Sequence, residues 1–188
     1  MPKVELHSGR DAFAGFMDEF MNESDRACII LASAEMEARF QLLFEKLLRV
    51  NSALEKKLFG FNGPLATFSA RVKMAYALKI IAKDFFDLLE AFRSVRNKIV
   101  HKGVRTSLKD PEVAKASEAI LAHFSKSRKF ERWAFAISGM DRDQYQFRHA
   151  IGFMIAMIEH TTEFLEPIAM KPHSCDPEEF LLDKLDKA

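Results

Sequence analysis

The chain has 188 residues, 48% of them hydrophobic and 29% charged, which is typical of one globular domain with a sizeable core. Its formal net charge of +1 excludes the basic excess of a dedicated nucleic-acid-binding protein, so any such contact must depend on a local patch. Two distant cysteines, Cys28 and Cys175, exclude a disulfide framework and a cysteine metal site, and no apolar run is long enough to span a membrane. We expect a cytoplasmic protein without metal or cofactor.

Apolar residues at helical spacing predict helices along most of the chain. Ser8 and Asp11 form a capping box that opens the first helix. The second helix, from about residue 24 to residue 50, is the most apolar and has two apolar stripes on opposite faces. One stripe consists of Ala27, Ile30, Leu31, Ala34, Ala38 and Leu42, and the other of Ile29, Met36, Phe40, Leu43 and Leu47. Such a helix is buried from both sides, either at the centre of a bundle or across a contact between subunits, and we expect a homo-oligomer.

Two carboxylates, Glu35 and Glu37, lie within this apolar helix. Because the burial of an isolated charge is costly, each carboxylate needs a cationic partner. Arg71 is a candidate, since it lies among small apolar residues of a third helix that we expect between residues 66 and 82. We therefore assign Glu35, Glu37 and Arg71 to a structural polar core, and a catalytic role for the carboxylates is the alternative.

The remaining elements complete an all-α fold. We expect a loop with Gly60, Gly63 and Pro64, and helices over residues 52–59, 84–101, 111–124 and 142–165. The segment after residue 125 is ambiguous between a short helix and extended chain. Prolines and acidic residues change the composition near residue 167. The sequence therefore predicts a single-domain multi-helix bundle over residues 1–167 and an acidic tail over residues 168–188 that is at most partly ordered.

The C-terminal end of the helix over residues 84–101 carries a basic surface. Its apolar residues form a stripe that faces the core, whereas Arg93, Asn97 and His101 form a polar ridge on the side that the core does not contact. On an ideal helix the side chains of Arg96 and His101 diverge by about 140°. A solvated helix end is one interpretation, because cations suit the C-terminal end of the helix dipole. The alternative is a contact surface for a partner or nucleic acid, formed by Arg93, Arg96, Asn97, Lys98, His101, Lys102 and Arg105.

Three blocks of the sequence resemble the mannitol operon repressor family of bacteria. They are Ser24 to Ala27, Leu58 to Tyr76 with its Gly-Pro-Leu and Phe-Ser-Ala-Arg core, and Arg93 to His101. The resemblance extends over most of residues 20–165, and the middle block is the most distinctive. It implies a compact all-helical regulator that lacks a recognisable DNA-reading motif and represses genes of sugar-alcohol uptake through partner proteins.

A shorter element, Arg96-Asn97 followed by His101, resembles the Arg-Asn-x-x-x-His signature of HEPN domains. These helical bundles include metal-independent ribonucleases and inactive scaffolds. The resemblance implies that Arg96 would bind a phosphate, that His101 would act as an acid or base, and that Asn97 would support them. Because Arg96 and His101 diverge on the helix, such a site would need the helix end to unwind or a second subunit to contribute.

These observations favour a transcriptional repressor of the mannitol operon repressor type over an enzyme. We expect it to act through contact with another regulatory protein, with DNA contact that is weak or indirect. The alternatives are a metal-independent ribonuclease that uses Arg96 and His101, and a helical scaffold that performs no chemistry.

Overall fold

The computed structural model describes residues 17–18, 20–48, 51–101, 107–126 and 142–168. Across these residues the chain forms α-helices and no strand, which confirms the predicted all-α fold. The helices are α2 (Asp25–Leu48), α3 (Ser52–Phe59), α4 (Phe68–Ala77), α5 (Lys83–His101), α6 (Pro111–Phe124) and α8 (Arg142–Phe164).

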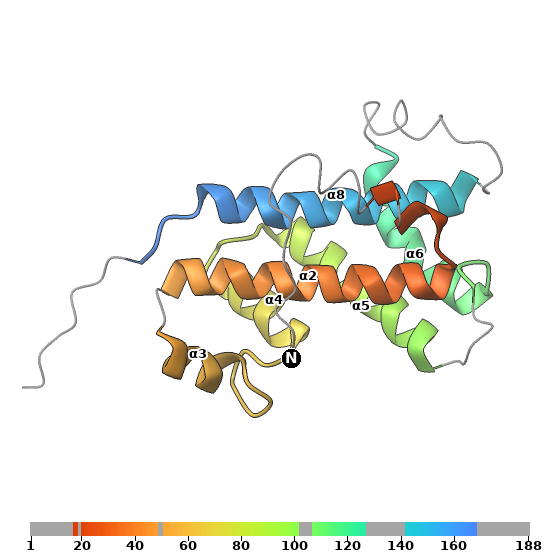
Figure 1. Ribbon diagram of the computed structural model, residues 1–188. Helices are drawn as coiled ribbons and strands as arrows, with labels where there is room; N and C mark the ends of the chain where they lie inside the picture. The colour runs from red at the N-terminus through yellow and green to blue at the C-terminus, as the bar shows by residue number, and fades with distance from the viewer. Residues whose placement is uncertain (1–16, 19, 49–50, 102–106, 127–141, 169–188) are drawn as a thin grey trace, which may run out of the picture.

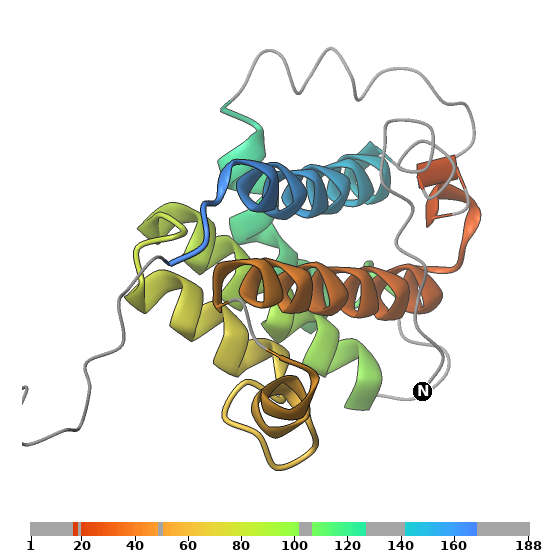
Figure 2. The ribbon, with the colours of Figure 1, turned by 60° about the vertical axis from the view of Figure 1, so that its left-hand side comes forward.

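Two long helices, α2 and α8, lie side by side and run in the same direction (Figure 1). Near their N-termini, Arg148 of α8 donates a hydrogen bond to Asp25 Oδ1 at 2.9 Å. Near their C-termini, Lys46 Nζ donates to the carbonyl oxygen of Thr162 at 2.8 Å. The helices α4, α5 and α6 cross behind this pair, whereas α3 and the loop that follows it project from the bundle (Figure 2).

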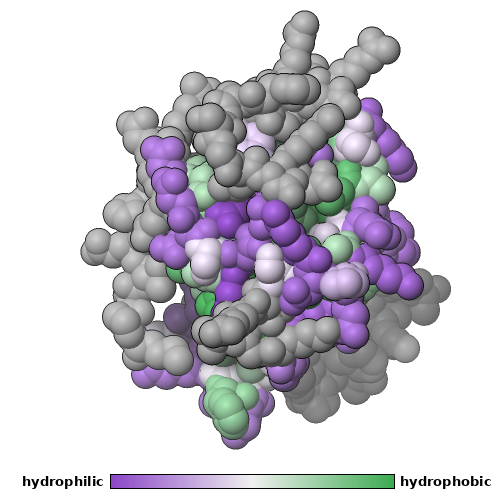
Figure 3. All heavy atoms as spheres, turned by 90° about the vertical axis from the view of Figure 1, so that its right-hand side faces the viewer, coloured by the Kyte–Doolittle hydropathy of each residue, from purple (hydrophilic) through white to green (hydrophobic). Residues whose placement is uncertain are grey.

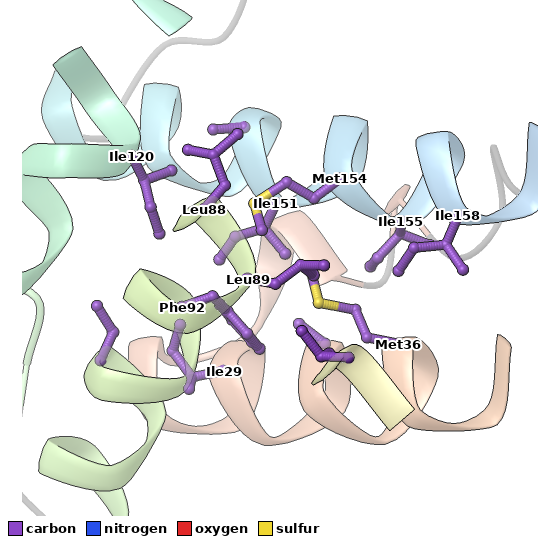
Figure 4. Packing of buried hydrophobic residues seen from close by; sticks show 14 of the residues in the cluster. Ile29, Met36, Leu88, Leu89, Phe92, Ile120, Ile151, Met154, Ile155 and Ile158 are labelled. Carbon is purple, nitrogen blue, oxygen red and sulfur yellow. The ribbon is translucent and has the colours of Figure 1, made fainter. Parts of the chain in front are cut away.

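One hydrophobic core lies between α2, α5, α6 and α8, and Figure 4 shows side chains of these helices converging on it. The apolar stripe predicted for α5 is buried, as the sequence indicates, and consists of Phe85, Leu88, Leu89, Phe92, Val95 and Ile99. Burial of each such side chain stabilises the fold by about 1.5–3 kcal/mol relative to its exposure to water. The stripe therefore orients α5 so that its polar side stays at the surface.

The two apolar stripes of α2 have different surroundings. The stripe that contains Ile29 and Met36 is buried, on the side where α4, α5 and α8 pack. By contrast, Ile30, Leu31 and Leu42 of the other stripe are exposed over 43%, 38% and 39% of their surface. The prediction that α2 is buried on both faces is therefore wrong for a single chain, because the described helices pack against one face. Burial of the second stripe between subunits stays a prediction.

The helix α4 is shorter than the sequence predicts. Thr67 caps its N-terminus, where the Ala70 amide donates to Thr67 Oγ1 at 3.2 Å. Its C-terminus is at Ala77 rather than near residue 82, because Lys79 adopts the left-handed conformation with a φ of 57°. The turn that follows buries Ile81 and lets α5 pack against α4.

Several predicted features lie outside the described residues. They are the start of the first helix at Ser8, the basic residues Lys102 and Arg105, most of the ambiguous segment after residue 125, and the acidic tail beyond residue 168. None of the described helices is long and apolar enough to cross a membrane.

Candidate functional site

A cleft of about 310 Å³ opens where α2, α4 and α5 meet. It is lined by Ser33 and Glu37 of α2, by residues 66–69 at the start of α4, and by Phe92, Arg93, Arg96 and Asn97 of α5. The cleft thus brings the polar ridge of α5 together with the segment that follows the loop containing Gly60 and Gly63. These two segments are separate in the sequence, and the packing of α4 against α5 joins them.

The N-terminus of α4 borders this cleft and supplies positive potential. The first amide groups of a helix have no acceptor within the helix, and the helix dipole places partial positive charge there. No acidic residue in the first turn of α4 offsets this charge. The Ala70 amide is capped by Thr67, whereas Phe68 and Ser69 belong to the lining of the cleft. This end of the cleft is therefore suited to a carboxylate or phosphate oxygen.

The two arginines of the cleft differ in their partners. Glu90 binds Arg93: its carboxylate accepts a hydrogen bond from Arg93 NH2 at 2.6 Å, and this bond raises the pKa of Arg93. Arg96 donates to the side-chain oxygen of Asn97 at 3.2 Å and meets no carboxylate among the described residues. Among the described residues, the Arg96 guanidinium is therefore the cation of the cleft without a carboxylate partner, and an anionic group from another molecule can bind it.

Glu37 also lines the cleft, but Arg71 offsets its charge. Arg71 is buried; its NH1 group lies 3.8 Å from Glu37 Oε1 and donates to the Glu37 carbonyl oxygen at 2.8 Å. Its Nε donates to the carbonyl oxygen of Leu65 at 2.7 Å, and its guanidinium lies over the Phe59 ring, 5.4 Å from the centroid. Burial lowers the pKa of Arg71, and the charge of Glu37 opposes this shift. Arg71 thereby joins α2 to the segment that leads from α3 into the cleft.

The cleft contains Arg96 and Asn97 but not His101. His101 is the last residue of α5, is exposed, and lies outside the lining of the cleft. Five residues along a helix separate two side chains by about 7.5 Å along the axis and about 140° around it. Figure 3 views the molecule from the side on which α5 ends, and the described residues that are coloured there are mostly hydrophilic with some hydrophobic ones among them. The lining of the cleft therefore includes Arg96 without His101, and a ribonuclease site formed by these two residues stays a prediction.

Other reactive side chains among the described residues do not form a site. No group of three or more His, Cys, Asp or Glu residues in that part of the chain is placed to hold a metal ion. Burial raises the pKa of the Cys28 thiol to about 12. Cys28 is therefore neutral near pH 7 and behaves as a small apolar side chain of the core.

The match to a known protein family extends over most of the chain. The sequence model of the mannitol repressor family matches residues 21–157, which include the cleft and the helices from α2 to α6. The chain belongs to the mannitol repressor family. Its fold is similar to the X-ray structure of the MtlR–HPr complex from Escherichia coli, with a TM-score of 0.56 and 19% sequence identity over 81% of this chain and 99% of that chain. No curated protein sequence matches the chain significantly.

The part that matches the mannitol repressor family also contains a buried polar cluster that the sequence did not predict. Arg148 is buried and donates to Asp25 Oδ1 at 2.9 Å and to the Met21 carbonyl oxygen at 2.8 Å. The Asp25 carboxylate also accepts from the Leu108 amide at 3.0 Å and from Ser107 Oγ at 2.8 Å. Burial by itself would raise the pKa of Asp25, but these hydrogen bonds and the Arg148 charge lower it. The sequence did contain a sign that Arg148 is buried, because Arg148 lies among apolar residues of α8 such as Phe147 and Ile151. Nothing in the neighbouring sequence indicated that Asp25 is its partner.

Glu35 has a different partner from Glu37. It pairs with Arg39 on the next turn of α2, and Arg39 NH2 lies 3.5 Å from Glu159 Oε2 of α8. Burial lowers the pKa of Arg39, and Glu159 opposes the shift. Because two residues along a helix are about 200° apart, Glu35 and Glu37 point to different sides of α2. Among the residues assigned to one polar core, the structure therefore brings Glu37 and Arg71 together, whereas Glu35 pairs with Arg39.

Proposed function

We propose that this chain is a transcriptional repressor of the mannitol repressor type that acts by binding another regulatory protein. The family match over residues 21–157 is the observation that carries the proposal. The similar solved structure is a complex of an MtlR protein with HPr, which supports HPr as the partner of this chain. We place its action in the cytoplasm, where a repressor meets the transcription machinery of a bacterium.

The proposed contact surface is the cleft between α2, α4 and α5. Arg96 meets no carboxylate among the described residues, and the N-terminus of α4 adds partial positive charge at the same cleft. A carboxylate of the partner in this cleft would receive charge-assisted hydrogen bonds from both. In this proposal the contact surface also includes the other residues that the sequence assigns to it, which are Arg93, Lys98, His101, Lys102 and Arg105.

Calorimetric titration of the purified chain with HPr tests this function. We expect binding, and we expect Arg96→Gln to weaken it by about tenfold, or about 1.4 kcal/mol. Lys115→Gln is the matched control, because Lys115 is an exposed cation of α6 outside the lining of the cleft. If HPr does not bind the wild-type chain, HPr is not the partner. If Arg96→Gln and Lys115→Gln weaken binding equally, the loss comes from the lower net charge of the chain and not from a contact in the cleft.

Direct contact with DNA is weak and independent of sequence in this proposal. The net charge of +1 provides little attraction for DNA phosphates. A gel-shift titration at physiological salt should show no sequence-specific complex with the chain alone. A tight footprint on one operator under these conditions would contradict this part of the proposal.

A second copy of the chain is the proposed cover for the exposed stripe of α2. Ile30, Leu31 and Leu42 present apolar surface along one side of a long helix. A symmetric contact between two copies would remove this surface from water, which is the usual reason for exposed apolar stripes in oligomers. The proposed repressor is therefore a homo-oligomer.

The proposal assigns no catalytic role to Arg96 and His101, because the cleft contains the first residue and not the second. Incubation of wild type and His101→Ala with a panel of RNAs tests this assignment. RNA cleavage that disappears in the variant would establish the ribonuclease alternative. Stable binding of a partner without any change in transcription would instead favour a scaffold.

A further inference from the structure

The loop between α3 and α4 holds an aromatic ring in water. Phe61 is exposed over 98% of its surface, and no other large hydrophobic side chain among the described residues exceeds the 73% of Phe164. Figures 1 and 2 show α3 and this loop projecting below the α2–α8 pair. An exposed phenylalanine forgoes the stabilisation that burial of its ring would provide, and this apolar surface is available to another molecule.

The backbone of this loop is held in one path by hydrogen bonds. The Gly60 amide donates to the Lys56 carbonyl oxygen at 3.0 Å, and the Gly63 amide donates to the Gly60 carbonyl oxygen at 2.7 Å. The Leu65 amide closes the loop by donating to the Leu58 carbonyl oxygen at 2.9 Å. Because the buried Leu65 also accepts from Arg71, the end of the loop is fixed to the core. The exposure of Phe61 is therefore imposed by an ordered backbone.

Two glycines make this path possible. A Cβ atom at Gly60 would collide with the carbonyl oxygen of Lys56, and one at Gly63 would collide with the carbonyl oxygen of Leu58. Any other residue at either position would push the loop out of its path. The sequence has glycine at both positions where the backbone leaves no room for a Cβ atom, and the loop that carries Phe61 can therefore keep its hydrogen-bonded path.

Between residues 51 and 78, which include the loop, the charged side chains are mostly positive. Lys56, Lys57 and Lys73 are exposed, and Arg71 is engaged with Glu37. Glu55 is the only carboxylate between residues 51 and 78. A partner surface that meets this loop is therefore favoured if it carries carboxylates around an apolar pocket.

We propose that Phe61 is the apolar anchor of the partner-binding surface and enters an apolar pocket, rimmed by carboxylates, on the regulatory protein. This inference rests on the proposed function, because it assigns a second contact to the surface that begins at the cleft. The loop leads directly into residues 66–69, which line the cleft, so only residues 62–65 separate Phe61 from the lining of the cleft in the sequence. Rigid aromatic side chains are effective anchors because little conformational freedom is lost when they bind.

Titration of HPr with wild type, Phe61→Ala, Phe61→Leu and Phe164→Ala tests the anchor. We expect Phe61→Ala to raise the Kd by at least about tenfold, and Phe61→Leu to raise it less, because leucine keeps much of the apolar surface. Phe164→Ala removes another exposed ring, at the end of α8, and should leave the Kd unchanged. The thermal midpoint of unfolding should be the same for Phe61→Ala and wild type, because the Phe61 ring is exposed over 98% of its surface.

The possible outcomes distinguish Phe61 as an anchor for HPr from a wrong partner and from a contact between two copies of the chain. Equal HPr affinity of wild type and Phe61→Ala overturns the anchor and leaves the proposed function standing. Failure of HPr to bind wild type overturns the proposed partner and the anchor together. If sedimentation shows that Phe61→Ala dissociates an oligomer while its HPr affinity is unchanged, the ring contacts a second copy of the chain and the inference is wrong.

Discussion

Arg148 and Arg96 lie on helices that share one core, yet their surroundings differ. Arg148 is buried, and Asp25 and the Met21 carbonyl oxygen accept its hydrogen bonds. Arg96 is half-buried beside an open cleft, and Asn97 is its acceptor. A cation that water cannot reach must be paired within the chain, whereas a cation at a cleft can be paired by another molecule. The difference separates an arginine that holds helices together from one that is available for recognition.

Removal of Arg148 should produce the largest effect. Arg148→Met leaves the Asp25 carboxylate without its cationic partner, and we expect the free energy of unfolding to fall by about 3–5 kcal/mol. Urea denaturation followed by circular dichroism measures this change. A loss below about 1 kcal/mol would show that Arg148 does not hold the helices together as proposed.

The double variant Asp25→Asn with Arg148→Met tests whether Asp25 is the partner through which Arg148 stabilises the fold. Because the two side chains contact each other, their effects should not add, and the double variant should lose at least about 1 kcal/mol less than the sum of the single variants. The four free energies of unfolding form the thermodynamic cycle that measures this coupling. Additive losses would mean that Asp25 is held by the Leu108 amide and Ser107 rather than by Arg148.

A charge on the exposed stripe of α2 tests the proposed oligomer. Leu31→Glu should raise the dissociation constant of the oligomer by at least about tenfold, because it places a carboxylate in an apolar contact. Sedimentation equilibrium measures the mass. Leu54→Glu is the matched control, since Leu54 is a similarly exposed leucine of α3. A wild-type chain that sediments as a monomer at all concentrations would contradict the proposed oligomer.

The stability of the fold at low pH depends on Asp25. Its pKa in the folded chain is below the ordinary value of 3.8, so the unfolded chain binds this proton first as the pH falls. The stabilising contribution is therefore present above pH 3.8 and is lost as the pH falls through the lowered pKa. Denaturant titrations over this range should show a shallower decline for Asp25→Asn than for wild type. Parallel declines would show that other carboxylates dominate acid unfolding.

Replacement of Arg96 should have the smallest effect on stability. Arg96→Met removes a side chain that contacts Asn97 beside an open cleft, so we expect the free energy of unfolding to change by less than about 0.5 kcal/mol. The same urea denaturation as for Arg148→Met measures it. A loss comparable to that of Arg148→Met would remove the distinction between the two arginines.

Much of the secondary structure could be predicted from the sequence. The buried face of α5 could be predicted, because apolar side chains at three- and four-residue spacing indicate which face of a helix packs against the core. Asp110 and Pro111 marked the start of α6 in the same way, since proline suits the first position of a helix. The end of α4 was not predictable, because the left-handed turn at Lys79 depends on the return of α5 rather than on a local signal such as glycine.

The candidate site was less accessible to prediction. Arg96 and Asn97 were identified as part of a polar ridge, but their cleft also needs residues 66–69 and Glu37 from other helices. Phe61 was part of a predicted loop, yet its exposure depends on hydrogen bonds that fix the loop outside the core.

Apart from the end of α4, the sequence by itself determined the described helices from α2 to α8, the charged end of α5 and the two apolar stripes of α2, because these depend on spacing along one segment. Only the tertiary structure decided that one stripe of α2 is buried and the other exposed. It also decided that Arg148 is paired inside the chain with Asp25, 123 residues away, whereas Arg96 is left beside a cleft. Such pairings depend on which distant segments pack together, and helical periodicity carries no information about that choice.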